Sequence, residues 1–543
     1  MQVAHFLEAD LRPWGAALAN ALFAPESGSA AAAAAAAVVN SAAPCDSDSA
    51  WQCLEELRPL DGAVDAVLRA WRAPLLGKLP RTPAEWQPAV IGAEAISGSL
   101  DLSYSEAVAC CDAMHAVRGV HTLSFCWSDA LVDGSEAEAE RACTAVASLP
   151  KLRTLEVGHD DASLFGPVAH ALVSALTRLT ELQELSMHWE DASLAVLARP
   201  LGLLTTLTRL DLSIDADYCQ EGAVLLAPAL TGLSCLAYFS LGCGGRGEVT
   251  ALGPALGTLT SLTALDLSDS GVDVEAYPDA EGVDGYHAAK ALALGLSHLS
   301  QLATLNLFRA YACPGGAATL APALCQLTAL TSLYMSENCI DANDAAALAP
   351  ALSRLLQLAY LDLSSNELGA AGAAALAPSI ALLTALTSLQ LDGNGVDANG
   401  AAALAPAFSR LSRLASLDLR SNALGAAGAA ALAPSIALLT KLTSLDFSSN
   451  GVGANGAAAL APALGCLTVL TFLHLSRNGI GDDGLQQLAP ALARLTGLRS
   501  LSLRDDRMSD SAEDALRARL PASVWQASDL HDRPRKRQRA AAS

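Results

Sequence analysis

The usual signals of catalysis and of metal binding are missing from this sequence of 543 residues. Aromatic residues are few, at 4%, and the 13 cysteines include no CxxC pair, so neither a zinc site nor a secreted disulfide framework is indicated. The chain has no nucleophile elbow, Walker loop or HExxH motif, and its 10 histidines are dispersed. We therefore expect no catalytic residues, no cofactor and no metal.

Basic charge is scarce as well. Lys and Arg number 33 against 56 Asp and Glu, which gives a formal net charge of −23. Contacts to phosphate need clustered Lys and Arg. We expect the body of the protein not to bind nucleic acid, and we expect a protein partner with a basic surface.

A membrane signal is also absent. The first residues carry Glu8 and Asp10 where a signal peptide would have a basic start, and the alanine run at residues 30–37 is too short to span a bilayer. We expect an intracellular protein without a membrane segment.

What the chain does contain is a repeated leucine pattern, LxxLxLxxN. From Leu302 onward it recurs every 28 residues, and a weaker unit surrounds Leu100 and Leu102. In one unit, residues 358–366 alternate as a strand does, and residues 372–383 space Leu376 and Ile380 as a helix does. Neither element can bury its apolar side alone, so neighbouring units must stack.

These residues resemble the leucine-rich repeat family over about residues 96–510, and the 28-residue unit is similar to its ribonuclease-inhibitor type. The fixed positions are supplied by Leu358, Leu361, Leu363, Asn366, Leu368, Gly372, Leu376 and Ile380. The resemblance implies an α/β fold: a right-handed solenoid (horseshoe) of about 14 strand-helix units, with a parallel sheet on the concave side and helices on the convex side. It also implies a protein-interaction scaffold.

Three segments are expected from this pattern. Residues 1–90 form a small helical N-terminal region with a low-complexity linker at about 25–50, residues 91–520 form the solenoid, and residues 521–543 form a disordered basic tail. In the first segment, Trp71 and Arg72 resemble the tail of an F-box, although a packed helical cap is the favoured role.

Two columns of single residues are expected inside the repeats. The asparagines match the family's asparagine ladder, in which a side-chain amide bonds the backbone of the turn; they are Asn338, Asn366, Asn394, Asn422, Asn450 and Asn478. A proline recurs within the expected helices, at Pro322, Pro350, Pro378, Pro406, Pro434, Pro462 and Pro490. Because interior proline disrupts a helix, we predict a kink or a split into two short turns at each one.

The candidate binding site is the concave face, where side chains at the third, fifth and seventh positions of each unit point away from the core. Exposed aromatics next to carboxylates favour protein binding. The candidates are Tyr238, Phe308, Tyr334, Tyr360, Asp362, Asp418, Asp446, Phe472 and His474. The alternative is that these side chains are solvated and have no binding role, which we favour for the serine-rich units. Around Phe308, Tyr334 and Tyr360 we favour binding.

An insertion lengthens the step from Leu262 to Leu302 to 40 residues. We predict a loop at residues 271–287, in which Tyr277, Asp279, Glu281 and Tyr286 bind a basic partner or are simply solvated. The carboxylate spacing does not fit a calcium loop.

A basic run near the C-terminus contains Arg535, Lys536, Arg537 and Arg539, which fit a nuclear-import pattern. The nucleus is therefore weakly favoured over the cytoplasm, including the cytoskeleton or a ciliary axoneme.

The favoured function is a non-catalytic scaffold or adaptor that binds a partner on the concave face. One alternative is a regulator of an enzyme, either a Ran-type GTPase activator or an F-box-like substrate receptor for a ubiquitin ligase. Residues 242–247 also satisfy GxGxxG, but they follow a strand in phase with the repeats, and this favours the solenoid over nucleotide binding.

Overall fold

The computed structural model describes residues 98–103, 120–126, 143–144, 146–147, 149, 151–158, 172–189, 194–214, 222–243, 248–269, 283–310, 314–504, 508–520 and 524. The chain divides into two compact units, Met1–Leu212 and Ser213–Ser543. The predicted N-terminal region and nearly all of the predicted tail, including the import residues Arg535 to Arg539, lie outside the described residues. So do Tyr277, Asp279 and Glu281 of the predicted insertion loop.

The described residues form strands that alternate with helices. The strands are β1 (Gly98–Ser103), β2 (Val120–Cys126), β3 (Thr154–Gly158), β4 (Glu184–Trp189), β5 (Arg209–Ile214), β6 (Tyr238–Cys243), β7 (Ala264–Asp266), β8 (Thr304–Asn306), β9 (Ser332–Tyr334), β10 (Tyr360–Asp362), β11 (Ser388–Gln390), β12 (Ser416–Asp418), β13 (Ser444–Asp446), β14 (Phe472–His474) and β15 (Ser500–Ser502). The helices are α10 (Leu194–Leu201), α11 (Gly222–Leu230), α12 (Glu248–Leu256), α13 (Val283–Leu296), α14 (Gly316–Leu324), α15 (Ala342–Leu352), α16 (Gly369–Ile380), α17 (Ala398–Phe408), α18 (Gly425–Ile436), α19 (Gly453–Leu464), α20 (Gly481–Leu492) and α21 (Asp510–Arg517).

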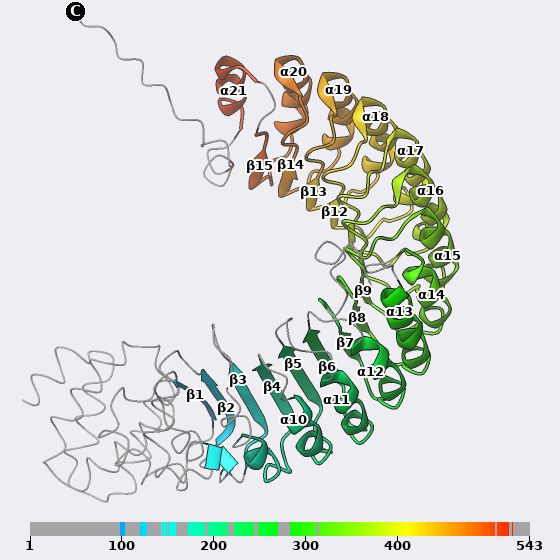
Figure 1. The fold of residues 1–543 in the computed structure, drawn as a ribbon. Coiled ribbons are helices and arrows are strands. Elements are labelled where there is room, and N and C mark those ends of the chain that lie inside the picture. Colours follow the sequence, from blue (N-terminus) through cyan, green and yellow to red (C-terminus); the bar gives the residue numbers. More distant parts are fainter. Residues whose placement is uncertain are drawn as a thin grey trace, which may run out of the picture. The chain divides into compact units, whose positions relative to one another are not determined.

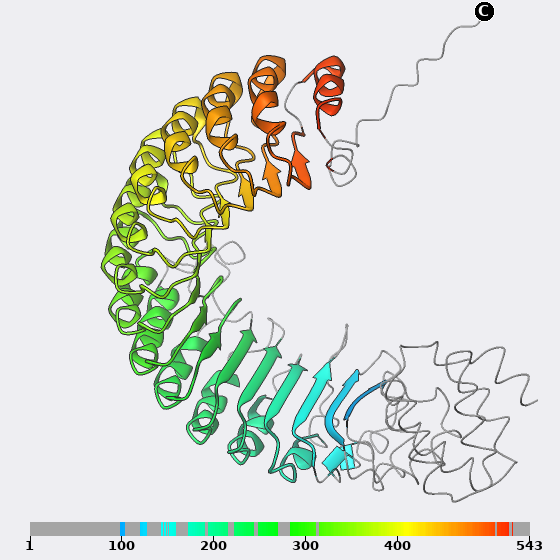
Figure 2. The same cartoon turned by 180° about the vertical axis from the view of Figure 1, so that it is seen from behind.

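Within each unit the strands pair in parallel and in sequence order. In the first unit β1 to β4 are neighbours, and in the second β6 to β15 are. From β6 onward equal repeat positions stand side by side without a register shift, so Leu361 lies between Leu333 and Leu389. In the second unit the strands form a curved sheet that lines the inner side of the curve, and the helices line the outer side (Figures 1 and 2). The predicted fold class is confirmed.

The core is built from the predicted leucine positions. In the repeat that contains β10, the side chains of Leu358, Leu361, Leu363, Leu376 and Ile380 have no exposed surface. Each contributes roughly 1.5–3 kcal/mol by burial. The weaker unit around Leu100 is also a strand, β1, so the described residues include 15 strands against the predicted 14 or so units.

The asparagine ladder is confirmed over the six predicted positions, all of which are buried. Asn422 is typical: its Nδ2 donates to the carbonyl of Leu391 in the preceding repeat at 2.9 Å and to that of Leu419 in its own repeat at 3.0 Å. Each amide therefore ties two consecutive turns together, and its own polar atoms are largely satisfied in the core.

The ladder alternates in a way that the sequence analysis did not predict. Gly395 has a φ of 63°, which turns the N–H groups of Asn394 and Val396 toward Oδ1 of Asn422, at 3.1 and 2.9 Å. In the next repeat the N–H of Ala423 instead bonds back to the carbonyl of Val396. Oδ1 of Asn450 is consequently buried without a hydrogen-bond partner, as is Oδ1 of Asn394.

The split predicted at each proline is wrong. Each of α14 to α20 runs unbroken through its proline, because the proline is the third residue from the helix end rather than central. In α15, Pro350 deprives only the carbonyl of Ala346 of its helical partner, and Ala346 is exposed to solvent. Water can therefore bond that carbonyl, which removes most of the usual cost.

The predicted loop at residues 271–287 is wrong at its C-terminal end. Residues from Val283 onward belong to α13, a helix of 14 residues against 9 in α12, and Tyr286 lies in its first turn with 47% of its surface exposed. Part of the extra length therefore extends a helix. In the described part of the chain, no helix combines the length and apolar character needed to cross a membrane.

Candidate functional site

The inner face of the second unit carries two rows of side chains that flank the buried leucines. We call this surface the strand face. Its outer row, at the third repeat position, and its middle row, at the fifth, are both partly exposed, whereas the leucine between them is buried. The middle row from β8 to β14 reads Asn306, Tyr334, Asp362, Gln390, Asp418, Asp446 and His474.

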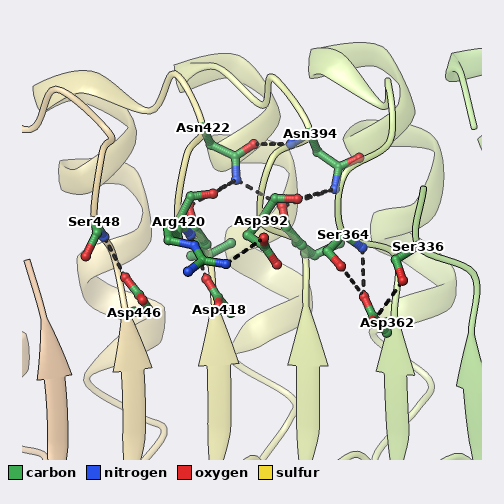
Figure 3. A network of polar contacts seen from close by, with 12 residues as sticks. Ser336, Asp362, Ser364, Asp392, Asn394, Asp418, Arg420, Asn422, Asp446 and Ser448 are labelled. Atoms are coloured by element: carbon green, nitrogen blue, oxygen red, sulfur yellow. Dashed lines mark hydrogen bonds and ion pairs between the residues drawn. The ribbon is translucent and has the colours of Figure 1, made fainter. Parts of the chain in front are cut away.

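The middle-row aspartates hold the turns that follow their strands. Oδ1 of Asp362, Asp418 and Asp446 accepts a hydrogen bond from the backbone N–H two residues later, at 2.9, 2.8 and 2.8 Å (Figure 3). Asn306 does the same for Phe308 at 3.0 Å. This is the local bond by which Asp and Asn favour turns. The repeat pattern, which suggested either partner binding or simple solvation for these residues, did not indicate this structural role.

Tyr334 and Tyr360 form an aromatic pair on the strand face. They come from the neighbouring strands β9 and β10, and their ring centroids lie 4.6 Å apart at an interplanar angle of 32°. Asp362 stands beside Tyr334 in the register. Burial, followed by the negative charge of Asp362, raises the pKa of Tyr360 to about 12, so its hydroxyl stays protonated and can donate a hydrogen bond.

The other predicted aromatics do not join this pair. Phe308 lies under the guanidinium of Arg309, whose Cζ is 5.9 Å from the ring centroid, and Arg309 is itself paired with Glu337 at 3.2 Å. Tyr238 is on β6 and Phe472 on β14, each at least two strands away from the pair. Phe472 is the most exposed of the outer-row residues that we predicted, at 45%.

Next to the tyrosine pair the strand face is acidic. Asp392, which was not among our site residues, pairs with Arg420 at 3.2 Å, and Asp446 lies 3.4 Å from Nδ1 of His474. Between them, Asp418 accepts from the backbone N–H of Arg420 (Figure 3). Burial, together with the negative charges of Asp446 and Asp392, raises the pKa of Asp418 to about 6. Negative charge is therefore in excess around Asp418.

The two neighbouring aspartates should respond to pH in opposite ways. Because the pKa of Asp418 is raised in the folded protein from 3.8 to about 6, its ionisation costs stability, and this cost grows as the pH rises through that window. Asp418→Asn keeps the turn bond and removes the charge. We expect it to increase the free energy of unfolding at about pH 7.5 and to have no such effect below the ordinary pKa of Asp.

Asp446→Asn is the matched control for that measurement. Burial raises the pKa of Asp446, but hydrogen bonds from His474 and Ser448 outweigh this effect and hold it below 3.8. Its ionised form therefore stabilises the fold above that value, and the stabilisation is lost as the pH falls through the folded pKa. Urea denaturation of both variants should give changes of opposite sign near neutral pH, and changes of the same sign would contradict this account.

One buried carboxylate was missed by the sequence analysis. Asp344 is 1% exposed and accepts from the backbone N–H groups of Gly315 and Ala318, at 2.9 and 2.8 Å, across the start of the neighbouring helix α14. The signal was available, since Asp344 stands at the position where later repeats have Gly372, Gly400 and Gly428. Its role is structural.

No metal chemistry is built into the described part of the chain, where no group of three or more His, Cys, Asp or Glu residues is placed to hold an ion. The strand face instead offers a pair of aromatic rings, hydroxyl groups and carboxylates on a rigid parallel sheet. These groups suit recognition of another polypeptide.

Comparison with known proteins identifies one family model and several solved structures to which the chain is similar. The family model described as Leucine Rich repeat matches residues 358–377, 383–405, 414–433, 439–461 and 466–489. No curated protein matches the chain. Among solved structures, an internalin of Listeria monocytogenes is similar at 20% identity and a TM-score of 0.44, covering 72% of this chain and 89% of that one. A leucine-rich repeat protein of Leptospira interrogans is similar at 15% identity and a TM-score of 0.43, covering 82% and 98%.

Repeats of this kind generally serve as scaffolds for protein-protein interaction. The family matches, the 28-residue period and the parallel strand-helix architecture agree with one another. The fold is that of a leucine-rich repeat solenoid, and leucine-rich repeats are matched within residues 358–489 of the chain.

Proposed function

We propose that this protein is a non-catalytic scaffold that binds a protein partner on the strand face between β9 and β14, and that the partner presents basic residues. The observation that carries the proposal is the aromatic pair Tyr334 and Tyr360 lying beside a row of carboxylates with excess negative charge. Aromatic anchors supply much of the energy of protein interfaces.

The chemistry of the strand face matches a basic side chain in two ways. A guanidinium or ammonium group can lie over a tyrosine ring, a contact that contributes about 0.5–2 kcal/mol depending on desolvation. Asp418 can then take a cation of the partner, since Arg420 already pairs with Asp392 at 3.2 Å. Electrostatic complementarity of this kind accelerates encounter and selects among partners.

Affinity purification from the native cell, with quantitative identification of the bound proteins, tests the proposal. The strand-face variant combines Tyr334→Ala, Tyr360→Ala and Asp418→Asn, the last of which keeps the turn bond to the Arg420 N–H. We expect a partner recovered with the wild-type chain to fall at least about tenfold with this variant, because truncating an interface hot spot costs about 2 kcal/mol or more.

A matched control carries changes on the outer helical side, where Ala374, Ala402 and Ala430 are exposed. Replacing them by Gln leaves the strand face untouched, so this control should recover the partner fully. Equal recovery of every partner with wild type and with the strand-face variant would exclude the strand face as the binding surface.

The remaining functional predictions concern segments outside the described residues. A working import signal at Arg535 to Arg539, a basic-partner loop at Tyr277 to Glu281 and an F-box-like role for Trp71 and Arg72 stay predictions. No described residue favours an enzyme-regulating role over the scaffold.

A further inference from the structure

The two edges of the second unit, where its helices begin and where they end, carry opposite charge. Just beyond the ends of α15, α17, α18 and α20 lie Arg354, Arg410, Arg413, Lys441 and Arg494, all exposed, which we call the basic edge. Residues 352–358, 380–386, 408–414, 436–442, 464–470 and 492–498, which form this edge, contain no Asp or Glu. Because the whole chain has a net charge of −23, a surface with basic residues and no acidic ones differs strongly from the rest of the sequence.

The opposite edge, where the helices begin, is acidic. Asp341 and Asp397 are the N-cap residues of α15 and α17, and Asp482 and Asp483 lie in the first turn of α20. We call these four residues the acidic edge. A helix of about 12 residues separates the two edges by roughly 18 Å, about two Debye lengths at physiological salt, so the edges act independently.

The charges on the two edges occur in the same repeats. Three helices carry an aspartate of the acidic edge at the N-cap or in the first turn, namely α15, α17 and α20. Each is followed, two residues after its last residue, by an arginine: Arg354, Arg410 or Arg494. The helices α16 and α18 begin at Gly369 and Gly425, as α20 begins at Gly481, but they have no acidic residue in the first turn. There the residue two positions past the helix end is Leu382 or Leu438, each about half exposed.

Helix dipoles explain only part of this pattern. They favour acidic residues at every helix start and basic residues at every helix end. They do not explain why α16 and α18 have no acidic residue in their first turn, or why an exposed leucine stands two residues past their ends. Among the described residues no ion pair engages Arg354, Arg410 or Arg494, so these guanidinium groups are available to another molecule.

We infer that the basic edge binds the acidic edge of a second copy of this chain, repeat against matching repeat. The occupant follows from complementarity: a second copy offers an aspartate in each repeat that has Arg354, Arg410 or Arg494, and a glycine in each repeat that has Leu382 or Leu438. A Cβ added at Gly369 or Gly425 would meet nothing within 4 Å, so there is open space in front of both glycines.

The register of the sheet makes the match possible along the whole unit. Because β8 to β15 pair without a shift, equal positions recur at one spacing on both edges. The helices α15 to α20 stand side by side in order (Figure 1). A copy displaced along the strand direction therefore brings Arg354 and Arg410 onto Asp341 and Asp397, which occupy equal repeat positions, and Arg494 toward Asp482, which is one residue further along its repeat. Each helix end then meets a helix start, which also aligns the dipoles favourably.

Such a contact joins two different surfaces, so it is heterologous and leaves a free basic edge at one end and a free acidic edge at the other. Further copies can add in the same way. Sedimentation velocity of the full chain over a range of concentrations tests this, and we expect concentration-dependent assemblies larger than a dimer.

Two variants separate the edges. Arg354→Glu, Arg410→Glu and Arg494→Glu reverse the basic edge and should lower the association constant at least about 100-fold, because three favourable pairs become repulsive. Asp341→Asn, Asp397→Asn and Asp482→Asn neutralise the acidic edge and should lower the association constant about tenfold. Asn can still cap α15 and α17, and at position 482 its Oδ1 can still accept from the N–H of Ser509. Circular dichroism verifies that both variants remain folded.

Mixing the two variants gives the decisive result. The reversed variant still has its acidic edge and the neutralised variant still has its basic edge, so the mixture should form a complex of two copies that does not grow further. A third variant, Leu382→Gln and Leu438→Gln, should weaken assembly of the otherwise unchanged chain.

A wild-type chain that stays monomeric at every concentration would overturn the inference. So would assembly that is insensitive to either edge, or assembly that depends on the basic edge alone, since the occupant would then be another surface or another molecule. A control that replaces exposed Ala374, Ala402 and Ala430 by Glu adds negative charge away from both edges, and it should assemble as the wild type does.

Discussion

Asn422→Ala should lower the free energy of unfolding by about 4 kcal/mol, and Asn366 and Asn478, which make the equivalent bonds, should behave alike. The change leaves the buried carbonyls of Leu391 and Leu419 without the amide that bonds them, at 2.9 and 3.0 Å. It also removes the acceptor of the N–H groups of Asn394 and Val396. Each buried group left unsatisfied costs about 1–3 kcal/mol.

The alternation of the ladder supplies the control for this prediction. Asn450 donates to the equivalent carbonyls of Leu419 and Phe447, at 2.8 and 3.0 Å, but its Oδ1 accepts no hydrogen bond. Asn450→Ala should therefore cost about 2 kcal/mol less than Asn422→Ala, which corresponds to the two N–H groups that only Asn422 satisfies. Guanidinium denaturation followed by circular dichroism measures the free energy of unfolding of both variants. Equal losses would show that the hydrogen bonds accepted by Oδ1 of Asn422 do not stabilise the fold.

Gly253→Ala should also destabilise the protein, by about 3 kcal/mol. Gly253 of α12 and Gly295 of α13 allow the backbones of these two helices to approach closely. A Cβ on Gly253 would overlap the carbonyl of Ala291, and a Cβ on Gly295 would overlap the carbonyl of Gly253. Because the obstructing atoms are backbone, the helices must separate, and overpacking of this kind costs about 1–3 kcal/mol or more.

Gly257→Ala is the matched change nearby. A Cβ at Gly257 would meet Nδ1 of His298 at 3.3 Å and Cα of Gly295 at 3.6 Å, and the imidazole can rotate away. We expect a loss below about 0.5 kcal/mol, the usual range for a substitution without a clash. Thermal unfolding of the two variants measures the difference. A Gly253→Ala protein as stable as the wild type would mean that α12 and α13 do not approach as closely as the structure has them.

The strand face and the two edges divide the surface of the second unit by chemistry. Tyr334, Tyr360 and Asp418 offer rings and negative charge to a basic partner, whereas Arg354 and Arg410 lie at the edge and offer positive charge. A scaffold with both surfaces can hold a partner and a second copy at the same time, because the surfaces share no residue. Strand-face variants should therefore leave assembly unchanged, and this keeps the two proposals separately testable.

Several features of the site followed from the repeat pattern alone. The pattern predicted that Tyr334, Tyr360 and Asp362 share one side of the sheet, because alternate residues of a strand face the same way. It could not say that the two tyrosines pair, since this depends on the register between β9 and β10. Nor could it reveal that Asp418 and Asp446 differ in pKa, because their shifts arise from His474 and from other neighbours in adjacent repeats.

The sequence by itself determined the period, the strand-helix order, the buried leucines and the asparagine column. These are local consequences of side-chain periodicity and of amides that must be satisfied when buried. Only the tertiary structure decided that Pro350 is harmless near its helix end, that Val283 already begins α13, and that Gly253 meets Gly295. These outcomes depend on how the backbones of neighbouring repeats pack against each other. The order of residues along one chain does not specify the distance between those backbones.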